Sequence, residues 1–442
     1  MWIPGQGDVV PVVSRAILRM AVGYLAPQGK GQCVLRIPEV TIGVEHKGFP
    51  ISATGRPTRA LSGTLDDFLT PVLVLKRTEF EHNLELMTQF CEEHGISLSP
   101  HVKTTMSPEI ADAQLAHGAW AITLATPSQV RTFRELGAQR VILANELVDP
   151  QAIAWLSTEM DADPEFTCYC YVESLDGVDI LEKELAQRES RRALPVILEL
   201  GVRGGRAGVR ESPRLLAERV AVSGKLRLAG VGGFEGVISG ALDAPLLADV
   251  RAFLRRLRDT ADELRGMVDT EFVVTVGGSS FPELVAAELG NSWQRDGSVR
   301  VVLRSGCYVV HDSLGYQRFR ELVATEYDTL PFQPSLELWG RVLSTPEPRL
   351  AILDFGKRDT GVDAGLPVPL HRIRRASAVI EPAPPGELTA LNDQHAYFRG
   401  DLDVGDRVGF GISHPCTTFD KWRLFPVMDD SYVLCGTVQT LF

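Results

Sequence analysis

The chain has 442 residues, of which 44% are apolar and 23% charged, and 45 Lys and Arg against 57 Asp and Glu give a formal net charge of −12. This composition is typical of a globular protein and argues against collagen-like, coiled-coil and disordered classes. The acidic balance disfavours nucleic acid and anionic membranes as partners. Because single cores stop growing at about 250–300 residues, the length predicts two domains or one large barrel with an appendage.

Residues 1–65 show no sustained hydrophobic period and carry prolines at positions 38, 50 and 57, which predicts an irregular N-terminal segment. The beginning of this segment is mildly apolar but interrupted by proline and arginine, unlike a signal peptide. The chain has no run of eighteen apolar residues, so no transmembrane helix is expected. Its seven cysteines are an odd number scattered over the chain, which favours reduced thiols in a cytoplasmic protein.

From Thr70 onward, short β-branched and apolar runs alternate with longer segments of helical periodicity. This alternation is typical of parallel βαβ units, and about eight such units fit a (β/α)8 barrel, for which ~250 residues is usual. Nine runs are present, so one of them, 71–75, is expected outside the barrel; a doubly wound open sheet is the alternative. The runs cover 71–75, 98–103, 121–125, 140–145, 166–172, 194–200, 226–233, 271–278 and 299–306.

After Tyr316 the pattern changes to short strands bounded by turns, with proline-rich loops at 346–348 and 381–387 and little helix. This pattern predicts a compact all-β domain. The fold expected from the sequence is therefore α/β plus β: a TIM-like (β/α)8 barrel followed by a C-terminal antiparallel β domain. We divide the chain into an irregular segment at 1–65, the barrel at 66–325 and the β domain at 326–442.

Active sites of barrels lie at the carboxyl ends of the strands, where the second run brings His101 and Lys103. Lys103 ends this run among predominantly apolar neighbours. Removal of water from its ammonium group would favour the neutral amine that a Schiff-base lysine requires. A solvated lysine at the end of a strand is the alternative interpretation.

Later runs end in glycine, which lets the backbone approach a ligand and direct its N–H groups at an anion. Residues 277–280, Gly-Gly-Ser-Ser, precede a predicted helix, so a phosphate can bind at the helix N-terminus and the two hydroxyls. An ordinary turn with a serine cap is the alternative. The sequence contains neither GxxxxGK[ST] nor GxGxxG, and a phosphorylated cofactor therefore fits better than a P-loop or dinucleotide site.

His414 and Cys416 stand two residues apart after a predicted strand, so their side chains point to the same side of an extended chain. Imidazole and thiolate together suit Zn²⁺, and two protein ligands would leave positions open for water and substrate. A polar histidine beside a core cysteine is the alternative. Asp312, next to His311, is either a support of an active site or an ordinary turn residue.

The order of these motifs resembles the D-serine dehydratase/D-threonine aldolase family, whose members are fold-type III pyridoxal-phosphate enzymes related to alanine racemase. The resemblance covers roughly residues 65–442 and is closest to the bacterial amino acid deaminase branch. Two positions depart from the family pattern: Thr104 and its neighbours directly after Lys103, and Phe234, where some relatives have tyrosine. The matching segments are PHVKTTMSP, GAWAITLATPSQV, GVRGGRAGV, GGFEG, VGGSS, LRSGCYVVHD and SHPCTTFDKW.

The resemblance implies roles for the matching residues. Lys103 corresponds to the lysine that forms a Schiff base with pyridoxal 5'-phosphate, and Arg206 to an arginine near the phenolic oxygen of the cofactor. His414 and Cys416 correspond to the metal ligands of the zinc-dependent dehydratases, whereas similar aldolases have a carboxylate at the second position. The remaining residues implied to bind the cofactor are His101, Gly277, Gly278, Ser279, Ser280, Gly306, Cys307 and Tyr308.

The resemblance further implies a pyridoxal-phosphate- and zinc-dependent lyase that converts β-hydroxy D-amino acids, such as D-serine, to a keto acid and ammonia. Two alternatives stay open: a retro-aldol cleavage of the D-threonine aldolase type, and a noncatalytic pyridoxal-phosphate-binding protein. A homodimer is expected, because in this family the β domain of one subunit usually meets the barrel of another. The expected partner is a small amino acid substrate, with no role for nucleic acid or membrane.

Overall fold

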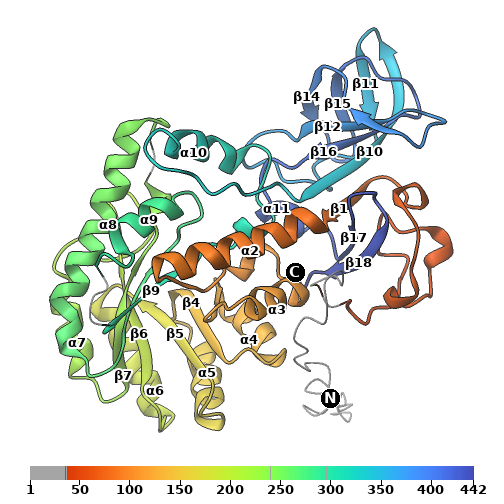
Figure 1. Ribbon diagram of the computed structural model, residues 1–442. Helices are drawn as coiled ribbons and strands as arrows, with labels where there is room; N and C mark the ends of the chain where they lie inside the picture. Colours follow the sequence, from red (N-terminus) through yellow and green to blue (C-terminus); the bar gives the residue numbers. More distant parts are fainter. Residues whose placement is uncertain (1–34, 36, 239, 294–296) are drawn as a thin grey trace, which may run out of the picture.

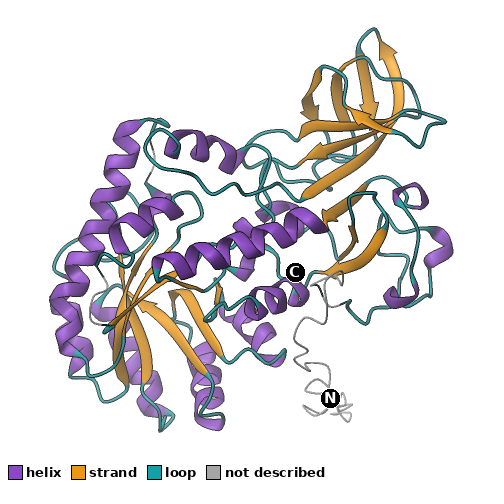
Figure 2. Cartoon of the chain, in the orientation of Figure 1, coloured by secondary structure: helices purple, strands orange, loops and turns teal. Residues whose placement is uncertain are grey.

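The structure is a computed structural model that describes residues 35, 37–238, 240–293 and 297–442. Two sheets organise these residues, one of them surrounded by helices and the other built mainly from the C-terminal part of the chain (Figures 1 and 2). The first 34 residues of the predicted irregular segment, including the region considered for a signal peptide, lie outside the described residues. No helix of the described chain is long and apolar enough to cross a membrane.

The first sheet is the predicted barrel. Its strands pair in parallel in the order β2-β9-β8-β7-β6-β5-β4-β3, and a bridge between His101 and Thr123 connects its two edges. Strands that follow one another in sequence are neighbours, so the barrel is confirmed and the doubly wound alternative is wrong. The strands are β2 (Ser97–Leu98), β3 (Ile122–Leu124), β4 (Arg140–Glu146), β5 (Thr167–Val172), β6 (Leu194–Leu200), β7 (Leu226–Gly233), β8 (Phe272–Val276) and β9 (Val299–Leu303).

Helices cover the outside of the barrel (Figure 2). Four of them begin where a side-chain oxygen accepts a hydrogen bond from a backbone N–H of the first turn, at Ser107, Thr126, Asp149 and Ser174. The helices are α2 (Arg77–His94), α3 (Pro108–Ala116), α4 (Pro127–Glu135), α5 (Pro150–Ala162), α6 (Leu175–Gln187), α7 (Pro213–Ala221), α8 (Ala244–Leu264), α9 (Pro282–Leu289) and α10 (Gly315–Val323).

The second sheet runs β13-β12-β16-β10-β1-β17-β18, and β11, β15 and β14 extend it from β10. The pairs are antiparallel except for the parallel pair of β1 with β17. The predicted β domain is thereby confirmed as a fold. The strands are β1 (Val72–Lys76), β10 (Leu336–Glu347), β11 (Leu350–Leu353), β12 (Val368–Ile373), β13 (Ile380–Pro382), β14 (Gly386–Leu391), β15 (Ala396–Gly400), β16 (Arg407–Gly411), β17 (Leu424–Met428) and β18 (Leu434–Gln439).

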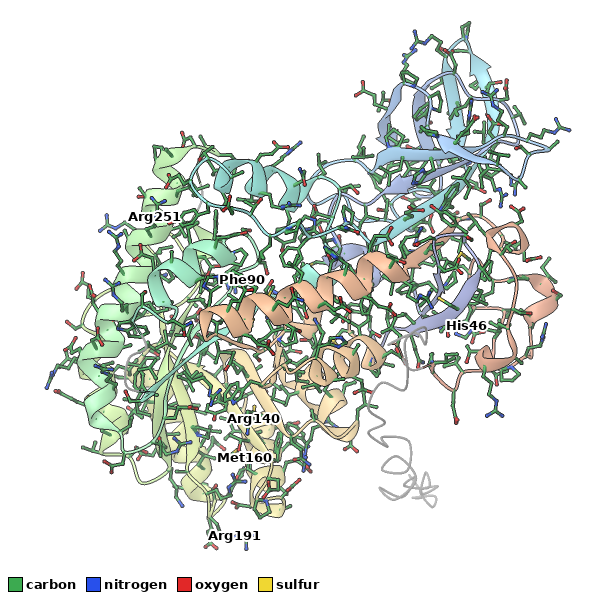
Figure 3. The ribbon with its side chains drawn as sticks, viewed as in Figure 1. His46, Phe90, Arg140, Met160, Arg191 and Arg251 are labelled. Atoms are coloured by element: carbon green, nitrogen blue, oxygen red, sulfur yellow. The ribbon has the colours of Figure 1, made fainter. Side chains whose placement is uncertain are left out.

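Strand β1, from the run expected outside the barrel, joins this second sheet between β10 and β17. Its alternating side chains serve two cores: Leu73 packs in the main cluster, and Val74 packs in a smaller cluster with the N-terminal segment. The main cluster also contains Phe90 of α2 and Met160 of α5, which Figure 3 labels. Strand β1 lies within the predicted barrel domain, 66–325, but pairs with strands of the second sheet. The division of the chain into a barrel at 66–325 and a β domain at 326–442 therefore stays a proposal.

Replacement of Leu73 by alanine is expected to lower the free energy of unfolding by about 2–5 kcal/mol, because a fully buried leucine leaves a cavity in the core. Denaturant or thermal unfolding followed by circular dichroism measures this change. The matched control is Val222→Ala, since Val222 is 79% exposed and its truncation is expected to stay within about 0.5 kcal/mol. Equal effects of the two substitutions would contradict the burial of β1 between the cores.

Candidate active site

Lys103 lies in a one-turn 3-10 helix, η4 (Val102–Thr104), at the carboxyl end of the barrel. This corrects the prediction of a strand over 98–103, because β2 ends at Leu98. The side chain of Lys103 is exposed, whereas Val102 and Thr104 on either side are buried. The desolvated surroundings expected for the amine are therefore not observed, and the amine is instead accessible to a ligand at the mouth of the barrel.

The imidazole of His101 precedes this turn, and its Nδ1 atom is buried with no hydrogen-bond partner in the described part of the chain. Burial, and then the positive charges of Lys103 and Arg304, hold the pKa of His101 well below its usual range, so the ring is neutral. Arg304 follows β9, is 4% exposed, and donates hydrogen bonds of 2.8 Å to Thr275 Oγ1 and Gly233 O. The sequence analysis did not single out Arg304, although an arginine directly after an apolar strand can indicate a polar site at the end of that strand.

The glycine-rich end of β8 is paired with a carboxyl group from within the protein. The backbone N–H of Gly277 donates to Glu235 Oε2 at 3.0 Å, and the N–H of Gly278 donates to Oε1. Glu235 begins the one-turn helix η5 after β7, and burial raises its pKa. Two amides that were expected to bind a phosphate thus have a partner already, which leaves the half-buried Ser279 and Ser280 as the polar groups of this turn.

Gly306, after β9, lies directly against the lysine turn. A Cβ atom at this position would lie 2.4 Å from His101 O, so glycine is required for the close approach of the two segments. Tyr308 is predicted to contribute to the cofactor site, but its side chain points elsewhere. Its hydroxyl bonds to Gln114, and the centroid of its ring lies 6.0 Å from that of Phe332. Its side chain belongs to the core, and only its backbone remains for a ligand.

Arg206 lines a cavity of about 350 Å³ at the carboxyl ends of β4, β5 and β6. Glu146 lines the same cavity and also bonds to Glu199 of β6. Burial and this contact raise the pKa of Glu199 to about 8, which favours one proton on this pair of carboxyl groups at neutral pH. Sequence reasoning missed this carboxyl pair; its signal is a glutamate near the end of each of two otherwise apolar strands.

Three potential metal-ligand atoms, on Cys307, His414 and Cys416, all lie within 4.8 Å of one another. Cys416 begins the short helix α11 (Cys416–Phe419), which packs on the lysine turn η4. Its Sγ lies 3.6 Å from Cys307 Sγ, and the hydroxyl of Thr104 lies 3.3 Å from Cys416 Sγ and 3.5 Å from Cys307 Sγ. The structure thus brings the two predicted ligands together and adds the thiol of Cys307, which was expected at the phosphate turn.

The hydrogen bonds within this cluster favour a thiolate beside an imidazolium in the metal-free protein. The bond with Cys307 lowers the pKa of Cys416 to about 4 despite burial, and His414 lowers it further. Burial would lower the pKa of His414, but hydrogen bonds to Asp312 and Cys416 outweigh it and raise the pKa to about 10. A thiolate is the form in which cysteine binds a metal ion.

Asp312 contacts the histidine of this cluster and also accepts hydrogen bonds within its own turn, so features of both interpretations are present. Its Oδ2 lies 3.3 Å from His414 Nδ1, and its Oδ1 accepts hydrogen bonds from the backbone N–H groups of Leu314 and Tyr316 at 3.1 Å and 2.8 Å. The carboxyl is fully buried. A carboxylate on one ring nitrogen fixes the imidazole and leaves the other nitrogen, Nε2, for a metal.

The residues present fit both groups that the sequence suggested. Two thiols and an imidazole form a soft to borderline donor set that suits Zn²⁺ better than Mg²⁺ or Mn²⁺. At the strand ends, His101 Nδ1 beside the turn of Lys103 lacks a partner among the described residues, as does the buried hydroxyl of Tyr171 on β5. Such orphaned atoms are expected where a polar ligand completes a site.

Comparison with family models gives two matches. Residues 75–298 match the N-terminal domain of alanine racemase, and residues 335–428 match a serine dehydratase domain. The first match spans the barrel strands from β2 to β8, and the second begins just before β10 and ends with β17.

Curated proteins and solved structures give further similarities. The chain is 28% identical to D-threonine aldolase of Arthrobacter sp over 373 residues, 82% of this chain and 90% of that protein. It is 31% identical to D-threo-3-hydroxyaspartate dehydratase of Delftia sp. (strain HT23) over 257 residues, 56% of this chain and 62% of that protein. A solved structure of a cysteine-to-alanine mutant of D-threo-3-hydroxyaspartate dehydratase, described as metal-free, aligns at 22% identity with a TM-score of 0.67 over 86% of this chain and 99% of that chain. This last similarity establishes the fold.

Proposed function

The chain belongs to the fold-type III pyridoxal-phosphate family related to alanine racemase, and on this premise we propose that it is a pyridoxal-phosphate- and zinc-dependent lyase of β-hydroxy D-amino acids. It would convert D-serine, or a similar substrate, to a keto acid and ammonia. The names of the relatives support the substrate class, since D-threonine and D-threo-3-hydroxyaspartate are both D-amino acids with a β-hydroxyl group.

One observation carries the preference for elimination: the thiols of Cys307 and Cys416 and the imidazole of His414 converge beside the turn that carries Lys103. Thiolates select Zn²⁺ over harder ions. Zinc at this position would act as a Lewis acid that makes the β-hydroxyl a better leaving group.

Pyridoxal phosphate, when bound, supplies an electron sink that stabilises negative charge at Cα. Lys103 Nζ would hold the cofactor and, once released by the substrate amine, take the Cα proton as a general base. Arg206 would bind the phenolic oxygen, and the hydroxyls of Ser279 and Ser280 would bind the phosphate. The neutral ring of His101 offers Nδ1 as an uncharged hydrogen-bonding group at the same mouth.

Elimination removes the Cα proton and the β-hydroxyl from the substrate, and the unsaturated amine that leaves takes up water to give the keto acid and ammonia. The buried Asp312 would hold His414 in one orientation throughout. Thr104 follows Lys103 in sequence and contacts both thiols, so it would fix the position of the base relative to the metal ligands. All of these roles are assigned to residues of a single chain. The homodimer that the resemblance implies stays a prediction, and analytical ultracentrifugation tests it.

Retro-aldol cleavage is the second candidate, because a D-threonine aldolase aligns over 82% of this chain. D-Threonine distinguishes the two reactions. Elimination gives 2-oxobutanoate and ammonia, whereas retro-aldol cleavage gives glycine and acetaldehyde. We expect the first pair of products, with L-threonine as the control substrate; glycine and acetaldehyde would instead favour the aldolase, and no turnover with cofactor and zinc bound would favour the noncatalytic protein.

Replacement of Asp312 by asparagine is expected to weaken zinc binding by roughly 10–100-fold, as is usual for loss of a carboxylate behind a metal-binding histidine. The asparagine oxygen can still accept the backbone N–H groups of Leu314 and Tyr316, so the loop keeps its hydrogen bonds. Competition with a chromophoric chelator measures the affinity. Asp420→Asn is the matched control, because this exposed carboxylate follows the same short helix α11; an equal loss in both variants would contradict the role of Asp312.

A further inference from the structure

The cluster beside Lys103 contains one more thiol than the resemblance assigned to a metal. Cys307 lies 109 residues before Cys416 in sequence and begins the one-turn helix η7 after β9. Its side chain is 4% exposed and points to Cys416 and Thr104. The thiol is therefore part of the same small group of donor atoms as His414 and Cys416.

The spacing of the two sulfur atoms suits a shared metal ion. Two thiolates at the usual Zn–S distance of about 2.3 Å from a tetrahedral ion are separated by about 3.8 Å. Cys307 Sγ and Cys416 Sγ lie 3.6 Å apart. The histidine nitrogen completes a set whose members all lie within 4.8 Å of one another, so a zinc ion fits among the three atoms with small side-chain adjustments.

We propose that Cys307 is a third protein ligand, so that the metal site is a Cys2His site and not a two-ligand site. The proposal rests on the metal-dependent function proposed above and deepens it. Three protein ligands with one open position are the usual pattern of catalytic zinc, whereas structural zinc has four protein ligands. No fourth metal-ligating side chain joins this group among the described residues.

Polar groups surround the sulfur of Cys307, but its hydrogen bond with Cys416 and its burial raise its pKa well above the usual range, so a binding metal ion would have to displace the thiol proton. The hydroxyl of Tyr316 bonds to its sulfur and the hydroxyl of Thr104 lies 3.5 Å from it, and a hydroxyl donor stabilises the negative charge of a ligating sulfur. Thr104 bonds to Cys416 as well, so one side chain next to Lys103 contacts both thiols. Tyr316 also bonds to Ser279 of the turn after β8, which connects the metal cluster with the proposed phosphate site.

A Cys2His site limits how many substrate atoms can bind to the metal. A tetrahedral ion with three protein ligands has a single free position, and this position would take the β-oxygen of the substrate. The substrate carboxylate would then bind to protein groups and not to the metal. Two thiolates also raise the preference for Zn²⁺ over Mn²⁺ and Mg²⁺.

Cobalt substitution tests the number of thiolate ligands without an assay of activity. Thiolate-to-Co²⁺ charge transfer absorbs in the near ultraviolet, and the intensity for each bound Co²⁺ follows the number of thiolates. The purified protein, kept reduced and stripped of metal, is titrated with Co²⁺, and bound metal is counted separately. The variants are Cys307→Ser, Cys416→Ser and, as the matched control, Cys435→Ser, whose half-buried thiol lies on β18 and bonds to Val427 O.

We expect one Co²⁺ per chain in the unmodified protein and in Cys435→Ser, and about half of the charge-transfer intensity per bound Co²⁺ in Cys307→Ser and in Cys416→Ser. Unchanged intensity in Cys307→Ser, with a decrease in Cys416→Ser, would overturn the proposal and leave the metal-dependent function standing. An unmodified protein that binds no Co²⁺ and no Zn²⁺ would overturn both.

X-ray absorption of the unmodified zinc protein keeps the proposal testable if Cys307→Ser does not fold. We expect a shell of two sulfur atoms at about 2.3 Å from zinc. A shell with one sulfur would overturn the assignment of Cys307. Circular dichroism and thermal unfolding of each variant establish which of the two experiments applies.

Discussion

Replacement of Lys103 by alanine is expected to abolish turnover in a protein that stays folded. Loss of a positioned general base alone lowers a rate by roughly 10²–10⁴-fold, and the same side chain is the proposed attachment point of the cofactor. The side chain is exposed in a one-turn helix, so its truncation leaves no cavity. The fold is therefore expected to tolerate the change.

Borohydride reduction followed by peptide mass spectrometry locates the attachment directly. The unmodified protein is expected to carry the pyridoxyl phosphate adduct on the peptide that contains Lys103 and to lose its absorption near the visible edge on reduction. Lys357→Ala is the matched control, because Lys357 is also exposed but follows β11 of the second sheet. An adduct on a different lysine, or a Lys103→Ala variant that keeps the absorption of the unmodified protein, would show that the attachment point is wrong.

Cys416→Ala is expected to bind the metal more weakly and to lower the rate of elimination by about 10²-fold or more, because a Lewis acid at the leaving group contributes several kcal/mol. The residues that we propose to hold the cofactor are other residues at the strand ends, so its absorption is expected to persist. Elemental analysis, product formation and the absorption spectrum of one preparation measure the three quantities together.

Cys435→Ala serves as the control for this variant, since Cys435 is half-buried like Cys416 but bonds to the backbone of β17. The two variants separate loss of a ligand from loss of a packed thiol. A Cys416→Ala protein that retains one zinc per chain and its elimination rate would contradict the proposed ligand.

The architecture was largely predictable from the sequence, because barrel strands such as β3 and β8 are short runs of buried, mainly β-branched and apolar residues. The runs at 194–200 and 299–306 became β6 and β9, and the run set apart at 71–75 became β1 of the second sheet. Helix starts followed from local chemistry as well, since a capping side chain and a proline mark them. Such features depend on neighbours in sequence and are readable from it.

The candidate site was only partly predictable, because its decisive contacts join distant segments. His414 and Cys416 are two residues apart and suggested a metal pair, but Cys307 reaches them only through the docking of α11 on the lysine turn. The pairing of Glu235 with Gly277 is likewise a contact across 42 residues, and it occupies an amide expected to bind phosphate. Apolar neighbours in sequence also suggested a buried amine at Lys103, whereas the chain turns before it and leaves the side chain exposed.

We propose that a metal held beside Lys103 makes elimination the reaction of this site. The most direct test is the conversion of D-serine by the holoenzyme, followed as pyruvate and ammonia before metal removal, after removal by a chelator, and after addition of Zn²⁺. We expect equal amounts of the two products, loss of their formation without metal, and its return with zinc. Pyruvate formation that continues in the metal-free protein, or glycine and formaldehyde as the products, would contradict it.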